Sequence, residues 1–307
     1  MHRYLFQSAL QTLIVTTVLA VACSSCLAAQ ESVVPGSMTA RETIDRILKA
    51  TGATLPPDTV DTIKAGDLNT PVTGIVTTFT PSMEVLRKAV AAGDNLIVTH
   101  EPTFYNHLDA ATLFVNDPVY QEKLAYIREH HLVVWRFHDA WHMRRPDGIA
   151  EGFANQVGWM QYETPGSAAD AGFFYTVPPT TVLAVARDLE RRLHARGVRI
   201  VGNPKLSITK VATLLGAGGE ADHIKTLERD DVQLLIVGEA REWETVEYVR
   251  DAQQQGRKKA LIVLGHLASE EPGMANCAQW LRGVFPGLPV HFIPATEPFW
   301  TLQHMPR

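Results

Sequence analysis

Cysteine is scarce in this chain, which has three cysteines among its 307 residues. Two of them, Cys23 and Cys26, lie in the N-terminal segment, so Cys277 stands alone in the rest of the chain. A single cysteine cannot form an internal disulfide, and it excludes a zinc site built from several thiolates. Any metal ligands must therefore be sought among histidine, aspartate and glutamate.

Basic tracts and nucleophile motifs are also missing. The formal net charge is −5 at pH 7, and the lysines and arginines are scattered, so we expect no nucleic-acid partner that depends on bulk positive charge. No elbow motif surrounds a serine. The glycines at residues 216–219 lack the Lys-Ser/Thr of a P-loop, so they indicate either a simple turn or a backbone site for an anion.

Long apolar runs are absent too, although 46% of the residues are hydrophobic, enough for a large core in one or two domains. The apolar run at residues 13–22 is shorter than the ~20 residues of a membrane span. It follows the basic start Met1-His2-Arg3 and precedes small residues, which is typical of a signal peptide. We expect residues 1–29 to be removed and the mature protein, without a transmembrane span, to be periplasmic or secreted. Cys23 as a lipid-anchored first residue is the alternative.

Short apolar strands alternate with amphipathic helices along the chain. Helices are expected at residues 40–51, 81–92, 119–129, 181–196 and 243–255, and strands at residues 70–78, 95–99, 132–137, 198–201, 211–215, 232–237 and 260–265. This alternation predicts an α/β fold with largely parallel sheets. Residues 144–179 are rich in Gly, Pro and Ala and low in periodicity, so we expect mostly loop there.

Three of the strands end in histidine or carboxylate residues: His100 and Glu101, His138 and His142, and His266 and Glu270. Ligands collect at the carboxyl ends of strands in open α/β sheets, and this mixture of side chains suits divalent metals. Each cluster also has an ordinary explanation, such as a polar turn with Asp139 or a glutamate in the first turn of a helix. A shared metal site explains all three strand ends at once, and we favour it.

A weak internal repeat adds a geometric reason for convergence. The pattern Glu-x-x-Arg-x-Ala-x-x-x-Gly at residues 84–93 recurs at residues 247–256, and each copy is followed by an apolar strand and a histidine, His100 or His266. Four matches in helical sequence can arise by chance. The other interpretation is a two-lobed, pseudo-duplicated architecture with the site between the lobes.

At this point the residues resemble a known family, the Nif-three-like (NGG-interacting factor three-like) proteins, also called GTP cyclohydrolase I type 2 homologues. The resemblance rests on residues 96–102 (LIVTHEP), 216–219, 238–239 and 265–270 (GHLASE), and it covers about residues 38–300. It implies a single α/β domain over about residues 38–304 with mixed, largely parallel sheets. The first lobe would span about residues 38–145, the connecting segment about 146–205, and the second lobe about 206–304.

The resemblance further implies a homo-oligomer, often a hexamer built from trimers, with two divalent metal ions between the lobes. Zn, Fe, Mn, Ni and Co are not distinguished. Carried over position by position, the implied metal ligands are His100, Glu101, His142, His266 and Glu270.

Two family positions differ in this chain. The family typically has Thr-His-His-Pro and a later His-x-x-x-Asp, whereas here Glu101 replaces the second His, and His142 replaces the Asp. His138 matches the leading His of the later motif. One imidazole and one carboxylate have thus exchanged places, which preserves three imidazoles and two carboxylates among the implied ligands. Trp243 stands where the family has a polar residue in the helix after Gly238.

The implied activity is metal-assisted hydrolysis of a small anionic compound, phosphorylated or nucleotide-like, through a metal-bound hydroxide. His138 would orient a ligand or act as general acid/base. The alternative is a non-catalytic metal-binding or partner-binding protein of the same fold, because no substrate-specific motif is present. Export counts against GTP as the substrate, since GTP is scarce outside the cytoplasm.

Overall fold

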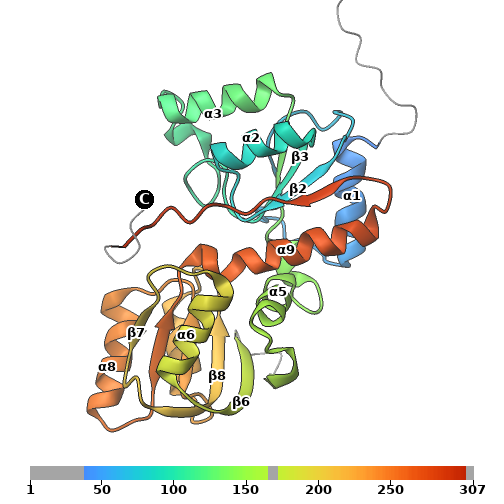
Figure 1. Cartoon of the computed structure of the whole chain (residues 1–307). Coiled ribbons are helices and arrows are strands. Elements are labelled where there is room, and N and C mark those ends of the chain that lie inside the picture. Colours follow the sequence, from blue (N-terminus) through green and yellow to red (C-terminus); the bar gives the residue numbers. More distant parts are fainter. Residues whose placement is uncertain (1–37, 165–171, 302–307) are drawn as a thin grey trace, which may run out of the picture. The chain divides into compact units, whose positions relative to one another are not determined.

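The computed structural model describes residues 38–164 and 172–301 of the chain (Figure 1). The expected signal peptide and the alternative lipid anchor at Cys23 lie outside the described residues. Among the described residues, no helix is both long enough and apolar enough to cross a membrane.

The first sheet has the strand order β1-β4-β3-β2-β11. Its strands are β1 (Ile63–Ala65), β2 (Ile75–Thr78), β3 (Leu96–Thr99), β4 (Val133–Arg136) and β11 (Val290–Phe292). All neighbouring strands are parallel except β1 and β4. Alternate residues of β3 face opposite sides, since Leu96 and Val98 join one core cluster and Ile97 another. Burial on both faces explains why these strands are continuous apolar runs.

The second sheet has the strand order β5-β6-β8-β9-β10-β7. Its strands are β5 (Glu163–Thr164), β6 (Phe173–Thr181), β7 (Arg199–Val201), β8 (Ser207–Leu214), β9 (Leu234–Val237) and β10 (Ala260–Val263). The central strands β8, β9 and β10 are parallel, and the outer pairings are antiparallel. The predicted α/β class with mixed, largely parallel sheets is confirmed.

Helices cover the faces of both sheets. They are α1 (Ala40–Thr51), α2 (Met83–Ala92), α3 (Pro118–Glu129), α4 (Asp139–Met143), α5 (Gly148–Val157), α6 (Val182–Leu193), α7 (Glu220–Glu228), α8 (Glu247–Gln254) and α9 (His266–Val284). A π-helical turn, Glu242–Val246, precedes α8. Helices α2 and α3 pack on one face of the first sheet, and α6 packs on the second sheet.

Helix α9 connects the two sheets (Figure 1). It begins directly after β10 of the second sheet, and its later residues Met274, Cys277 and Leu281 are buried in the core of the first sheet. The hydroxyl of Thr77 in β2 also donates a hydrogen bond to the Met274 carbonyl at 2.8 Å. The amino-terminal end of α9 is therefore held beside the first sheet, at the place where the candidate ligands meet.

The internal repeat corresponds to two similar helix–strand units. Helix α2 ends at Gly93 and leads into β3, while α8 is followed by Gly256 and leads into β10. Strand β3 is parallel to both of its neighbours, whereas β10 is parallel to β9 and antiparallel to β7. Each strand leads into one of the candidate histidines, His100 or His266, so the two copies of the pattern share the order helix, strand, histidine.

The loop predicted for residues 144–179 is wrong over much of its length. Residues 148–157 form the buried helix α5, and β5 and the start of β6 also fall in this range. A Cβ at Gly152 would lie 2.5 Å from Cα of Gly273 in α9, so the small residues allow two helices to approach closely. The glycines that indicated a loop are packing residues of a helix.

Candidate metal centre

The first pair of candidate ligands follows β3 at the carboxyl end of the sheet. The backbone N–H of His100 donates to the Thr78 carbonyl (3.1 Å), and that of Glu101 donates to the Phe79 carbonyl (2.7 Å). Pairing with the neighbouring segment thus continues past the strand and fixes both residues. His100 is completely buried, and its Nδ1 lies 3.4 Å from the Phe137 carbonyl.

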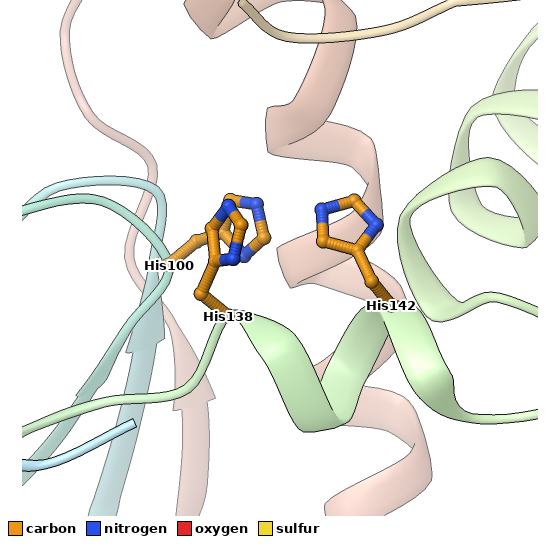
Figure 2. A group of neighbouring side chains, drawn as sticks. All are labelled: His100, His138 and His142. Carbon is orange, nitrogen blue, oxygen red and sulfur yellow. The ribbon is translucent and has the colours of Figure 1, made fainter. Parts of the chain in front are cut away.

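The second pair lies after β4, with His138 as the N-cap of α4 and His142 within that helix. The Asp61 carboxylate accepts hydrogen bonds from backbone N–H groups at the helix start, including those of His138 (2.8 Å) and Ala140 (2.9 Å). The N–H of His142 donates to the His138 carbonyl at 3.1 Å, so the two histidines are one turn apart, as their spacing predicted. Figure 2 shows both imidazoles beside His100, with the His100 and His138 rings stacked at 4.5 Å between centroids.

The third pair lies on the first turns of α9. Nε2 of His266 is 2.9 Å from Oε2 of Glu270 and 3.5 Å from Oε1 of Glu101. The same Glu270 oxygen is 3.4 Å from Nε2 of His100. Helix α9 therefore brings its two candidate ligands against those that follow β3.

The structure brings all six predicted site residues into one cluster. Two groups of three offer ligand atoms within 4.8 Å of one another: His100, His138 and His142, and His100, Glu101 and Glu270. The sequence assigned His138 to orientation or proton transfer. Its place among three imidazoles favours a ligand role for it as well.

Carboxylates that the sequence reasoning did not assign to the site lie beside three of the histidines. Each is 2.8–2.9 Å from Nδ1 of its partner: Asp139 beside His138, Asp147 beside His142, and Glu239 beside His266. When a neutral imidazole donates its Nδ1 proton to a carboxylate, its Nε2 keeps a lone pair that can bind a metal ion. This is the usual arrangement of histidines around a protein-bound metal. Asp139 and Asp147 are near their partners in sequence, whereas Glu239 meets His266 only through folding.

The carboxylates strongly favour a proton on His266 in the metal-free protein. Burial opposes that proton, but hydrogen bonds with Glu101, Glu239 and Glu270 outweigh it and raise the pKa of His266 to about 12. A divalent ion that binds this imidazole must displace the proton, so its affinity must rise with pH.

The pKa values of His138 and His142 are shifted in opposite directions. Burial opposes protonation of His142, but the Asp147 carboxylate outweighs it and raises the pKa to about 9. Burial, reinforced by positive charge at His100 and His142, lowers the pKa of His138 to about 3. His138 is therefore neutral and already free to bind an ion at physiological pH.

Arg136 is a site residue that the sequence analysis missed. It is completely buried at the end of β4, inside the run read as apolar. Its Nε donates to the His100 carbonyl (3.0 Å), Nη1 donates to the His107 carbonyl, and Nη2 lies 3.4 Å from Oε2 of Glu101. A charged residue in an otherwise apolar strand was the available signal, because a buried arginine needs partners.

The glycine-rich turn begins at Gly216, a position that requires glycine. Its φ is +70°, and a Cβ there would lie 2.1 Å from Oε1 of Glu270. Its N–H donates to Oγ of Ser269 (3.0 Å), and its carbonyl accepts from the N–H of Glu239 (2.9 Å). The turn therefore supports a candidate ligand by close backbone approach, which only glycine allows at this position.

The donor set fits divalent cations. Nε2 of His100 is buried and has no hydrogen-bond partner among the described residues. A buried polar atom left in that state costs about 1–3 kcal/mol, and coordination of an ion would remove the cost. Imidazole suits borderline metals and carboxylate suits harder ones, and both are present here.

A family model and curated relatives match this chain. The family model Duf34/NIF3 (NGG1p interacting factor 3) matches residues 43–298. A GTP cyclohydrolase 1 type 2 homolog of Clostridium perfringens is 23% identical over 226 residues, which are 72% of this chain and 82% of that protein. The homolog of Mycobacterium tuberculosis is 34% identical over 111 residues. This match covers 36% of this chain and only 27% of the length of that relative.

Solved structures show the same fold at low sequence identity. Staphylococcus aureus protein SA1388 has a TM-score of 0.70 at 16% identity, covering 86% of this chain and 99% of that one. A Bacillus cereus protein related to NIF3 has a TM-score of 0.68 at 14% identity, covering 87% and 99%. Because the family model spans most of the sequence and the fold agrees, the chain belongs to the Duf34/NIF3 family.

Proposed function

We propose that this protein binds two divalent metal ions and is a metal-dependent hydrolase acting on a small phosphorylated or nucleotide-like compound. The observation that carries the proposal is the convergence of four histidines and two glutamates from three separate segments. Three of the imidazoles have carboxylates at Nδ1, and the fourth, that of His100, has a buried Nε2 that makes no hydrogen bond among the described residues and lies 3.4 Å from Glu270.

The charge balance supports an anionic substrate. Two dications carry four positive charges against the two carboxylates Glu101 and Glu270, which leaves an excess of two at the inner site. The three carboxylates Asp139, Asp147 and Glu239 fix the imidazoles in place. They lie behind the imidazoles, further from the ions than Glu101 and Glu270, so they offset the charge of the ions more weakly. When bound, such ions would supply Lewis acidity that lowers the pKa of water and stabilises charge on a phosphate oxygen.

Accessibility of the cluster supports an enzyme over a purely structural metal protein. The side chains of His138, His142 and His266 are 24%, 32% and 22% exposed, while His100 and Glu270 are buried behind them. One face of the cluster is thus open to a small molecule. Closed coordination is typical of structural zinc, whereas catalytic sites keep an open position.

Arg136, Glu239 and the Gly216 turn have supporting roles in this proposal. Arg136 holds Glu101 by a side-chain contact and His100 through its carbonyl, so both keep their positions when a substrate enters. Glu239 is largely exposed and bonded to His266, which places a carboxylate at the open rim. Glu270 is held from behind by the Gly216 turn.

Metal analysis of the purified protein is the first test, and about two ions per chain are expected for a dinuclear site. The double variant His266→Ala, Glu270→Ala should lose at least one of the two ions and stay folded, whereas the control His130→Gln, outside the cluster, should keep both ions. A protein that neither retains nor rebinds metal would refute the dinuclear site.

Turnover is tested on the metal-loaded protein with phosphoester and nucleotide panels. GTP belongs in the panel because the curated relatives are named GTP cyclohydrolase 1 type 2 homologs. Hydrolysis that disappears in the double variant supports the hydrolase. Full metal occupancy with no turnover on any compound favours the alternative, a non-catalytic metal-binding or partner-binding protein.

Export and assembly belong to the same proposal. The basic and apolar N-terminus supports cleavage after residue 29 with a periplasmic or secreted product, and the intact mass of the exported protein would distinguish this from a lipid anchor at Cys23. The exposed side chains of Trp243, Phe299 and Trp300 support a homo-oligomer, since large exposed aromatics commonly mark contact surfaces. Light scattering of the purified protein tests this assembly and its hexameric form.

A further inference from the structure

The two groups of candidate ligands differ in chemistry. One is made of imidazoles only, from His100, His138 and His142. The other contains the carboxylates Glu101 and Glu270. His100 belongs to both groups, but its Nε2 has a single lone pair and can bind one ion.

His266 resolves this overlap. Its Nε2 is 2.9 Å from Glu270 and 3.5 Å from Glu101, so these three side chains supply a carboxylate-rich position without His100. His100 is then left for the imidazole position, where its ring stacks on His138 and its centroid is 5.1 Å from that of His142. Each position has three protein ligands, as open metal sites commonly do.

The ligand charges of the positions differ by two. Three neutral imidazoles surround one position, whereas Glu101 and Glu270 bring two negative charges to the other. Imidazole ligands suit Zn, Ni, Cu and Fe, and carboxylate oxygens suit Mn and Mg. The positions should therefore discriminate between metals of these two kinds.

We infer that the chain holds two different metals: a late, borderline ion such as Zn²⁺ at the imidazole position, and a harder ion such as Mn²⁺ at the carboxylate position. This inference rests on the dinuclear centre proposed above, but it makes no use of catalysis. It follows from the presence of His142 on α4 and Glu101 after β3, which concentrates imidazoles in one group and carboxylates in the other.

Competitive metal loading tests the inference. Zn²⁺ binds most nitrogen and oxygen sites more tightly than Mn²⁺, so the metal-free protein is equilibrated with one Zn²⁺ per chain and an excess of Mn²⁺. It is then desalted, and native mass spectrometry counts both metals on each chain. One Zn and one Mn are expected, with the Mn visible by electron paramagnetic resonance. Two Zn ions, or a random mixture, would overturn the inference and leave the dinuclear centre intact. Absence of both metals would instead refute the dinuclear centre itself.

Matched variants assign each metal to its position. His138→Gln removes one ligand from the imidazole position and should lose Zn while keeping Mn. Glu270→Gln removes one ligand from the carboxylate position and should lose Mn while keeping Zn. His142→Asp replaces one imidazole of the imidazole position by a carboxylate and should raise the Mn content at the expense of Zn. Equal loss of both metals in folded His138→Gln and Glu270→Gln, checked by circular dichroism, would contradict two distinct positions.

Discussion

Asp147 Oδ2 lies 2.9 Å from Nδ1 of His142. The other oxygen of the same carboxylate accepts from the N–H groups of Ile149 (2.8 Å) and Ala150 (2.9 Å) and thereby begins α5. One side chain thus starts a buried helix and orients a candidate metal ligand. The helix and the site are coupled through it.

Asp147→Asn separates these two roles. The amide keeps an oxygen for the helix start but replaces the negative charge behind His142, so metal affinity should fall by about 10–100-fold with little loss of helix. Calorimetric titration of the metal-free protein measures the affinity. Asp188→Asn, on the exposed face of α6, is the control and should bind metal like the wild type. An unchanged affinity in Asp147→Asn would mean that this carboxylate does not support the site.

The raised pKa of His142 predicts a pH dependence of stability. Its value of about 9 in the metal-free fold exceeds the ordinary 6.5, so the folded state holds this proton more tightly than the unfolded state does. The stabilisation is therefore complete below pH 6.5 and is lost as the pH rises through about 9. Metal affinity should rise over the same interval, because the ion competes with the proton.

Denaturation of the metal-free wild type and His142→Gln, from about pH 6 to about pH 9.5, checks this dependence. The difference in unfolding free energy between them should be largest at the acidic end and should shrink towards the alkaline end. A difference that does not change with pH would contradict the assignment.

Gly152→Ala should destabilise the fold through the contact between α5 and α9. The added Cβ would lie 2.5 Å from Cα of Gly273, in backbone that cannot move aside easily, so we expect a loss of about 1–3 kcal/mol. Gly283→Ala, also in α9, is the matched control, because its Cβ would meet nothing within 4 Å outside the backbone of its own helix. This substitution should stabilise the fold by up to about 1 kcal/mol. Chemical denaturation compares the two, and equal effects would argue against the close approach.

Gly216→Ala should weaken metal binding at the carboxylate position. A Cβ there would displace Oε1 of Glu270, and the positive φ adds backbone strain of about 1 kcal/mol. Gly219→Ala serves as the control in the same turn, because its nearest neighbour, Asp222, is 3.9 Å away. Metal content per chain is the measurement. Equal metal content in both variants would show that Glu270 does not depend on Gly216.

Much of the fold was predictable because the strands are buried on both faces. The apolar runs before His100 and His266 contain β3 and β10, although strand ends shifted, as for the run 70–78 that shortens to Ile75–Thr78. Residues 144–179 were misread because Gly and Pro favour loops locally. The packing of Gly152 against Gly273 is a property of two helices 121 residues apart in sequence, which local composition does not express.

The candidate ligands could be predicted from the sequence, whereas the contacts that hold them in position could not. Histidines at strand ends stand out because the neighbouring residues are apolar. The contacts that hold them are not visible in the sequence: the charge of Arg136 in an apolar run does not identify its partners, and Glu239 follows a different strand from its partner His266. Such contacts depend on register and on the path of α9.

The sequence by itself determined the class of fold and the six candidate site residues, since periodicity and residue type are local properties of the chain. Only the tertiary structure decided how those side chains lie relative to one another, and which carboxylates contact them. The physical reason is that coordination needs several ligand atoms within a few ångströms, and helix α9 brings them together across two sheets.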